Sequence, residues 1–236
     1  MKTSAQDVFT ALIKTKKELK IKLLGDSITH GVGGTGFAQN GEPIVDVFKR
    51  NPDGYCWANL FRDFMKDNFR ATVVNNACTG KNIEFIIKYF DSLVDADDDL
   101  IICSIATNNR HQYFIHGPRQ TKEQRIEQVY SAILELNGMF KRINKKVIFV
   151  ANIPAADKCE QDGPDYWRII HMNDINDIYK RASDAEGFPL ISMYDLFIEF
   201  TKERCIDFES LLRDGLHPND EGYRVMFHLF KCALGI

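Results

Sequence analysis

Short apolar runs alternate with longer amphipathic segments along most of this chain, and this alternation limits the folds that it can adopt. We expect strands over residues 21–24, 71–75, 100–106, 147–152 and 189–193. Helical periodicity predicts helices over residues 57–69, 83–93, 121–143, 167–186 and 220–234, the last of them capped by Asn219. Strands separated by such helices form parallel βαβ units with helices on both sheet faces. The sequence therefore predicts an α/β fold, a three-layer α/β/α sandwich around a five-stranded parallel sheet.

The chain has 236 residues, enough for one domain with a substantial core. No internal repeat, low-complexity tract or linker interrupts it, so we interpret residues 1–236 as a single domain. Two irregular stretches, residues 30–55 and 108–120, follow the first and third predicted strands. Open parallel sheets bind ligands at the carboxyl ends of their strands, so we expect these stretches to lie beside a binding site.

The formal net charge of −3 gives the chain no general attraction to nucleic acid or to anionic membranes. No apolar stretch approaches the length of a membrane span, and the first twenty residues lack the apolar core of a signal peptide. We therefore expect a cytoplasmic protein with no nucleic-acid partner and no membrane span. The oligomeric state is not predicted.

The six cysteines are scattered along the chain and include no C-x-x-C pair, which argues against a structural zinc site. Cys103 lies inside an apolar run, where a buried reduced thiol is expected. Without a secretory signal, free thiols are the expected state of the other cysteines as well.

Ser27 lies in the sequence Gly25-Asp26-Ser27-Ile28-Thr29, directly after the first predicted strand. A serine at this place is a candidate nucleophile, although a serine in a turn or helix cap gives the same local pattern. The position two residues after Ser27 is threonine, so this is not the Gly-x-Ser-x-Gly elbow of ordinary α/β-hydrolases.

Asp214 and His217 are three residues apart near the C-terminus. This spacing allows the carboxylate to hold the imidazole in the orientation that a general base needs, although a turn that caps the last helix would look the same. The other histidines fit less well as the base, because they lie in predicted helices or lack a suitably spaced carboxylate: His30, His111, His116, His171 and His228.

Acyl transfer also needs hydrogen-bond donors for the developing oxyanion. Gly80 follows the second predicted strand and offers a backbone N–H, and Asn108 follows the third and offers a side-chain amide. The backbone N–H of Ser27 would be a third donor. These residues are ordinary in loops when taken singly, and only their joint placement at strand ends suggests a site.

Taken together, the motifs resemble those of the SGNH (GDSL-type) hydrolases, the GDSL-like lipases and acylhydrolases. The matching blocks occur in the family's order: Gly25-Asp26-Ser27, Asn75-x-Ala77-x-x-Gly80, Thr107-Asn108 and Asp214-x-x-His217. The resemblance spans about residues 20 to 232 and implies a flavodoxin-like strand order.

The resemblance also implies roles for individual residues. Ser27 would be the nucleophile, His217 the base and Asp214 the orienting acid, with Ser27, Gly80 and Asn108 as the oxyanion hole. Two positions depart from the family pattern: Asn109 stands in place of an aspartate, and Ala77 in place of a glycine.

Residues 31–36 also match G-x-G-x-x-G, the pattern of dinucleotide-binding turns. That motif must lead from a strand straight into a helix, whereas this stretch runs into Asn40-Gly41-Glu42-Pro43. We therefore predict no nucleotide site here, and expect these glycines to form a flexible wall beside Ser27.

The predicted function is hydrolysis of esters through an acyl-enzyme on Ser27, with no metal and no organic cofactor. The loops at the strand ends carry polar and aromatic residues, which favours a small acyl group such as acetyl on a polar or carbohydrate-like alcohol: Gln39, Tyr55, Trp57, Arg110, His111, Tyr113 and Phe114. The expected partner is a small-molecule ester, acylated carbohydrates included. An acyltransferase, a lysophospholipase or thioesterase, and a non-catalytic binding protein remain as alternatives.

Overall fold

The computed structural model describes residues 3–37 and 51–236 of the chain, and its centre is a five-stranded parallel sheet. The strands are β1 (Leu19–Gly25), β2 (Ala71–Asn75), β3 (Leu100–Ser104), β5 (Lys146–Ala151) and β7 (Leu190–Ser192). Their order in the sheet is β2-β1-β3-β5-β7, and every neighbouring pair is parallel. This is the flavodoxin-like order, so the predicted fold class is confirmed.

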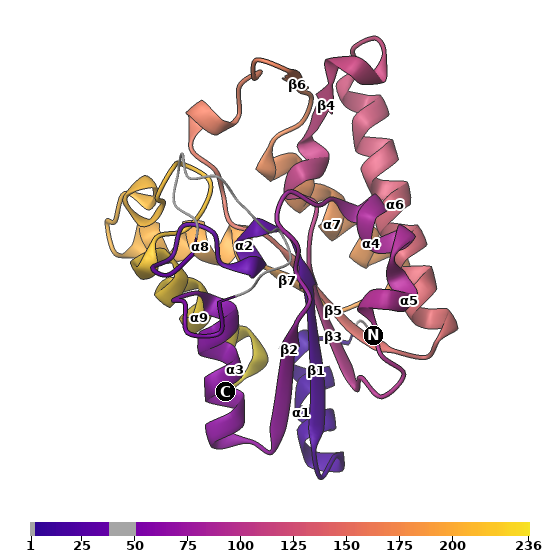
Figure 1. The fold of residues 1–236 in the computed structure, drawn as a ribbon, viewed down its shortest axis with the longest axis vertical. Coiled ribbons are helices and arrows are strands. Elements are labelled where there is room, and N and C mark those ends of the chain that lie inside the picture. The colour runs from indigo at the N-terminus through magenta and orange to yellow at the C-terminus, as the bar shows by residue number, and fades with distance from the viewer. Residues whose placement is uncertain (1–2, 38–50) are drawn as a thin grey trace.

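Helices cover both faces of the sheet (Figure 1). One face carries α1 (Ala5–Thr15), α3 (Trp57–Asn68), α8 (Met193–Glu203) and α9 (Asp220–Leu234). The other carries α4 (Ile83–Lys88), α5 (Phe90–Leu93), α6 (Lys122–Arg142) and α7 (Met172–Glu186). Successive residues of β3 alternate between the two cores: Leu100 and Ile102 pack on the first, Ile101 and Cys103 on the second. Burial on both faces explains why the strands read as continuous apolar runs.

A two-stranded antiparallel ribbon, formed by β4 (His111–Tyr113) and β6 (Tyr166–Arg168), stands apart from the main sheet (Figure 1). Short helical turns complete the described chain: α2 (Ser27–His30), η1 (Thr107–Arg110), η2 (Phe114–His116), η3 (Asp157–Cys159) and η4 (Phe208–Leu211). The six cysteines are free, and Cys103 is buried, as predicted. Among the described residues, none of the helices is both long and apolar enough to span a membrane.

Three predicted elements were wrong in their bounds. The helix expected over residues 167–186 begins only at Met172, because Tyr166–Arg168 pair with β4. The strand expected over residues 100–106 ends at Ser104, since Ala106 adopts a left-handed backbone with φ of 94°. The helix expected over residues 83–93 is divided at Tyr89 into α4 and α5. By contrast, α9 and its cap Asn219, whose side chain accepts the N–H of Gly222, are as predicted.

Candidate active site

Ser27 is the first residue of α2, at the carboxyl end of β1. Asp26 caps this short helix, and its Oδ1 accepts the backbone N–H of Ile28 at 3.1 Å. Gly31 ends the helix in the left-handed conformation with φ of 119°. The cap and the terminating glycine therefore set the position of Ser27, whose side chain is almost fully buried.

His217, near the C-terminus, lies next to Ser27, near the N-terminus. Its Nε2 lies 2.8 Å from Ser27 Oγ, and its Nδ1 lies 2.8 Å from Asp214 Oδ2. The other carboxylate oxygen of Asp214 accepts the backbone N–H groups of Leu216 at 2.9 Å and His217 at 2.8 Å. The three side chains that the sequence predicted as nucleophile, base and orienting acid thus form one continuous hydrogen-bonded chain.

The charge on Asp214 fixes which atoms donate and which accept in this series of hydrogen bonds. Burial raises the pKa of Asp214, but the hydrogen bond and charge of His217 and the two backbone N–H donors outweigh it and hold the pKa well below its usual range. The carboxylate therefore stays ionised at neutral pH and accepts from Nδ1–H, which leaves Nε2 to accept from the Ser27 hydroxyl. Because the folded-state pKa is lowered, the stability that Asp214 contributes is lost only as the pH falls below about 3.9.

The predicted oxyanion donors lie on the neighbouring strands. Gly80 follows β2 with φ of +71°, a conformation that favours glycine, and a Cβ there would meet no heavy atom within 4 Å. Open space thus adjoins its backbone. Asn108 Nδ2 donates one hydrogen to the carbonyl of Lys81 at 2.8 Å, so its second N–H stays available to a substrate. Because Asn108 bonds to the residue after Gly80, and both residues line one cavity, the two predicted donors lie close together at the ends of β2 and β3, the neighbours of β1.

One glycine of residues 31–36, Gly33, packs against the loop that carries His217. Gly33 has φ of +97°, and a Cβ there would lie 3.0 Å from His217 Cβ and 2.5 Å from the carbonyl oxygen of Pro218. Only glycine therefore lets this turn come so close to the loop that carries His217. Residues 40–43, on which the prediction against a dinucleotide turn rests, lie outside the described residues, so it stays a prediction.

Asn109, where the chain departs from the family pattern, is buried and fully hydrogen-bonded. Its Oδ1 accepts the backbone N–H of Ile83 at 3.0 Å, and its Nδ2 donates to Glu84 Oε2 at 2.8 Å. The negative charge that an aspartate would bring to this position is carried instead by Glu84. These two hydrogen bonds link the turn that carries Asn108 and Asn109 to the start of α4.

We predict that Asn109→Asp destabilises the protein by about 1–3 kcal/mol at pH 7, because two carboxylates would then face each other at hydrogen-bonding distance. The repulsion raises the pKa of the pair in the folded state, so the loss is smaller at pH 5 than at pH 7. Urea unfolding at both pH values measures this. Adding Glu84→Gln to the variant should restore the stability, and equal stability of Asn109→Asp and the wild type at pH 7 would contradict the prediction.

Asn152, which follows β5, was not predicted as a site residue. Its side chain forms hydrogen bonds with buried residues next to the site. Its Nδ2 donates to Thr107 Oγ1 at 2.8 Å and to Asp26 Oδ2 at 3.2 Å, and its Oδ1 accepts from Ser104 Oγ at 2.5 Å. All four side chains are buried. Burial raises the pKa of Asp26, and hydrogen bonds from Thr107 and Ile28 oppose that rise. A polar residue at the end of an apolar strand was the one available signal.

We expect Asn152→Ala to lower the free energy of unfolding by about 2–4 kcal/mol, because it leaves buried hydrogen-bonding groups without a partner. It should also lower esterase activity, since Asp26 caps the helix that begins with Ser27. Denaturant unfolding and an activity assay check this against Asn173→Ala, a substitution at an exposed position of α7. A variant as stable as this control would contradict the proposed network.

The structure places the polar and aromatic residues that were predicted in the strand-end loops as follows. The prediction that Trp57 belongs to a strand-end loop was wrong. It is buried at the start of α3 and packs on Phe230, with ring centroids 5.0 Å apart. Arg110 lies in the turn after β3, as predicted, and is buried there in an ion pair with Glu160. Gln39 lies outside the described residues. The exposed residues Tyr113 and Phe114 lie on the ribbon and the turn after it.

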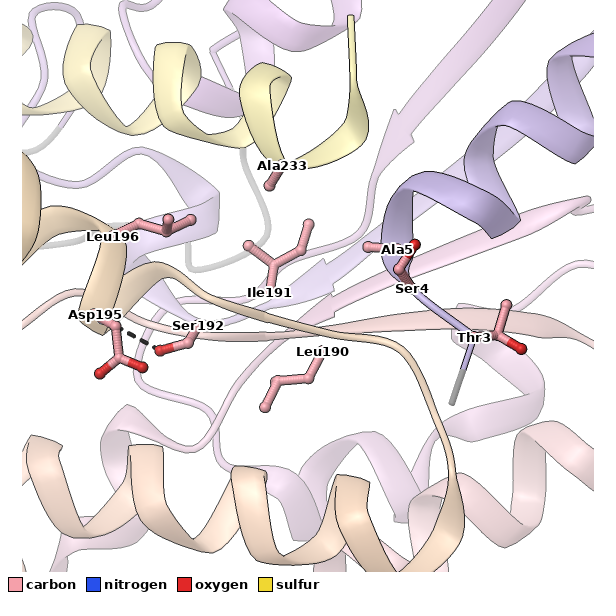
Figure 2. Close-up of a pocket in the computed structure, with 9 residues that line it drawn as sticks. All are labelled: Thr3, Ser4, Ala5, Leu190, Ile191, Ser192, Asp195, Leu196 and Ala233. Atoms are coloured by element: carbon pink, nitrogen blue, oxygen red, sulfur yellow. Dashed lines mark hydrogen bonds between the residues drawn. The ribbon is translucent and has the colours of Figure 1, made fainter. Parts of the chain in front are cut away.

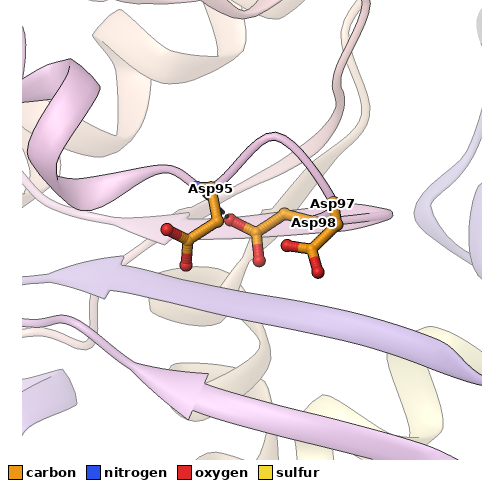
Figure 3. A group of neighbouring side chains, drawn as sticks. All are labelled: Asp95, Asp97 and Asp98. Atoms are coloured by element: carbon orange, nitrogen blue, oxygen red, sulfur yellow. Dashed lines mark hydrogen bonds between the residues drawn. The ribbon is translucent and has the colours of Figure 1, made fainter.

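Two other features lie away from Ser27. Asp95, Asp97 and Asp98 form an acidic cluster just before β3, at the amino end of the sheet (Figure 3). Lys20 and Lys22 of β1 form ion pairs with these carboxylates. A separate hollow of about 450 Å³ lies along the edge strand β7, between the start of α1 and Ala233 of α9 (Figure 2). None of the predicted site residues lines it.

Comparison with known proteins agrees with this architecture. Residues 23–225 match the GDSL-like Lipase/Acylhydrolase family. No curated protein sequence matches the chain significantly. Among solved structures, an acetylxylan esterase from Geobacillus stearothermophilus is similar at 16% identity, with a TM-score of 0.66 and coverage of 92% of this chain and 94% of the other.

Two further structures show the same likeness. An alpha/beta hydrolase enzyme from the metagenome of Lake Arreo, Spain, has 20% identity and a TM-score of 0.66, covering 92% of this chain and 95% of its own. A protein from Parabacteroides merdae described as a GDSL-like lipase has 18% identity and a TM-score of 0.65, covering 94% of this chain and 98% of its own. At these identities the structures show a shared fold.

Fold and family define the class of this protein as an ester hydrolase on a flavodoxin-like α/β/α scaffold. The chain belongs to the GDSL-like lipase/acylhydrolase family, the SGNH hydrolases.

Proposed function

We propose that the protein hydrolyses esters of short acyl groups with polar or carbohydrate-like alcohols, through an acyl-enzyme on Ser27. The observation that carries this proposal is the hydrogen-bonded chain from Ser27 through His217 to Asp214, with 2.8 Å at both side-chain contacts. A serine in this arrangement has its base within reach and its base has a fixed tautomer.

In the first half of the reaction, Ser27 Oγ bonds to the acyl carbon while its proton passes to His217 Nε2. The carbonyl oxygen becomes an oxyanion, which the N–H groups of Ser27, Gly80 and Asn108 stabilise. Collapse of this intermediate breaks the ester bond, and the alcohol leaves with the proton from His217. Asp214 stabilises the positive imidazolium between these steps.

In the second half, water attacks the acyl carbon of the Ser27 ester and gives a proton to His217 Nε2. The bond to Ser27 Oγ then breaks, Oγ recovers its proton from His217, and the carboxylic acid is released. The residues of this chain supply every proton transfer in both halves.

The preference for small and polar substrates rests on the surroundings of the oxyanion donors. A cavity of about 270 Å³ adjoins Gly80 and Asn108, and no aliphatic side chain is among its described lining residues. A long alkyl chain would gain little from such a lining, because burying it stabilises mainly through apolar contact. The likeness to an acetylxylan esterase is consistent with an acetyl ester of a carbohydrate.

A series of 4-nitrophenyl esters from acetyl to decanoyl, run beside Ser27→Ala, tests the proposal. The expected result is the highest kcat/KM at acetyl to butyryl and loss of this activity in Ser27→Ala. Rising kcat/KM toward decanoyl would favour the lysophospholipase or thioesterase alternative instead. If the wild type cleaves none of the esters, the catalytic proposal fails and a binding protein on this scaffold is the remaining interpretation.

The acyltransferase alternative shares the acyl-enzyme and differs in what attacks it. Product analysis with an acetylated sugar, with and without a second sugar as acceptor, separates the two. A hydrolase releases acetate at the same rate in both mixtures, whereas a transferase moves the acetyl group to the acceptor.

A further inference from the structure

The cavity beside Gly80 and Asn108 has a largely polar lining, which none of the proposed proton transfers uses. It lies between the turn after β2, the start of α4, the ribbon strand β4 and the first turns of α6. Its volume of about 270 Å³ corresponds to about nine water molecules at ~30 Å³ each, room for an acyl group of several carbon atoms.

The position of the cavity decides which part of a substrate it would receive. The leaving alcohol must lie next to His217, because that histidine protonates it. Neither His217 nor Ser27 nor Asp214 lines the cavity, whereas two of the oxyanion donors do. The cavity therefore adjoins the predicted oxyanion donors and not the histidine that protonates the alcohol, which is the place expected for the acyl substituent of the ester.

Arg125 of α6 is the unusual member of the lining. It is only 8% exposed, and its guanidinium donates to Gln128 Oε1 at 2.9 Å and to the backbone carbonyl of His111. Within the described chain its Nε has no hydrogen-bond partner. Burial lowers the pKa of Arg125, and the charge of Glu84 raises it. A buried donor without a partner is costly unless a ligand satisfies it.

The remaining polar groups set the charge of the cavity. Burial lowers the pKa of His111 to about 4, together with the charges of Arg168, Arg110 and Arg125, so its ring is neutral at pH 7. Arg168 can only donate, and it lies 3.4 Å from His111 Nδ1, so the remaining hydrogen is on Nε2. Glu84, held by Asn109, balances the charge of Arg125. Donors and an acceptor thus line the same cavity.

We propose that this cavity is the acyl subsite, and that it selects short acyl groups which carry a hydroxyl, with Arg125 as the residue that recognises that oxygen. The inference rests on the proposed esterase function and names its substrate class more closely. A plain alkyl chain would leave the polar lining unsatisfied. A hydroxyl can accept from Arg125 and donate to Glu84 at once.

Two matched esters with the same leaving group test the proposal, 4-nitrophenyl butyrate and 4-nitrophenyl 3-hydroxybutyrate. The wild type is expected to have a kcat/KM about 10- to 100-fold higher for the hydroxylated ester, the gain of one hydrogen bond to a charged group. After correction for the intrinsic reactivity of each ester, equal or lower kcat/KM for 3-hydroxybutyrate overturns the proposal.

Arg125→Met keeps the apolar stem and removes the donors. It should abolish the preference, so that kcat/KM for 4-nitrophenyl 3-hydroxybutyrate falls to about that for 4-nitrophenyl butyrate. Arg125→Lys keeps a charge without the planar fork and should lower the preference in part. Arg142→Met, the same substitution at an exposed position near the end of α6, is the matched control and should leave the preference intact. If Arg125→Met does not fold, the proposal is decided by the ratio of kcat/KM for the two esters, measured in the wild type and in Arg125→Lys.

A second series separates this inference from its alternatives. Acetyl esters of different alcohols are compared in the wild type and in Arg125→Met. If the variant changes selectivity among alcohols and not among acyl groups, the cavity holds the alcohol and the assignment is wrong. Activity on acetate without a hydroxyl preference rejects the inference alone, whereas no activity on any ester rejects the proposed function and the inference with it.

Discussion

Replacing Ser27 by alanine is expected to lower kcat for 4-nitrophenyl acetate by about 10⁵- to 10⁶-fold, with little change in stability. Ser27 Oγ makes the 2.8 Å contact with His217 Nε2 through which the proton leaves the nucleophile. Steady-state kinetics and thermal unfolding measure both quantities. Ser131→Ala, at an exposed position of α6, serves as the control. Retention of more than a few per cent of wild-type activity in Ser27→Ala would contradict the assignment.

Replacing Asp214 by asparagine should lower kcat by about 10³- to 10⁴-fold. The amide oxygen can still accept the backbone N–H groups of Leu216 and His217, so the loop is preserved. The amide nitrogen would then face His217 Nδ1 and favour the tautomer with hydrogen on Nε2. That tautomer cannot take the proton of Ser27, and the imidazolium loses its neighbouring charge.

Asp207→Asn is the matched control for this variant. Asp207 also accepts a backbone N–H through Oδ1, from Glu209 at 3.1 Å, and it belongs to a turn outside the predicted site. Its replacement should leave kcat unchanged. A loss of less than tenfold in Asp214→Asn would show that His217 works without its aspartate, and the role given to Asp214 would be wrong.

The sequence predicted the central sheet because its strands are buried on both faces, which makes them continuous apolar runs with long helices between them. The smaller elements carry no such signal. The ribbon of β4 and β6 has three residues in each strand, and its pairing joins segments that are far apart in the chain. Helix α8 follows β7 directly, with Ser192 as its cap, and so offered no loop to mark its start.

The predicted site residues lie in the short connections that follow a strand or precede a helix, where sequence motifs are local. Asp214, His217 and Ser27 are brought together by the fold as the motifs suggested. Asn152 escaped notice because it reads as the last residue of an apolar run, and its partners lie 45 and 126 positions away. Glu84 was missed because only tertiary structure shows that it carries the charge absent at Asn109.

The central claim is that Ser27 is an activated nucleophile, and labelling with a fluorophosphonate followed by mass spectrometry of the intact protein and its peptides tests it most directly. The predicted result is one phosphonyl adduct per wild-type chain, mapped to Ser27, with none in Ser27→Ala and slow labelling in His217→Ala. An unlabelled wild type, or an adduct that persists in Ser27→Ala, would contradict the claim.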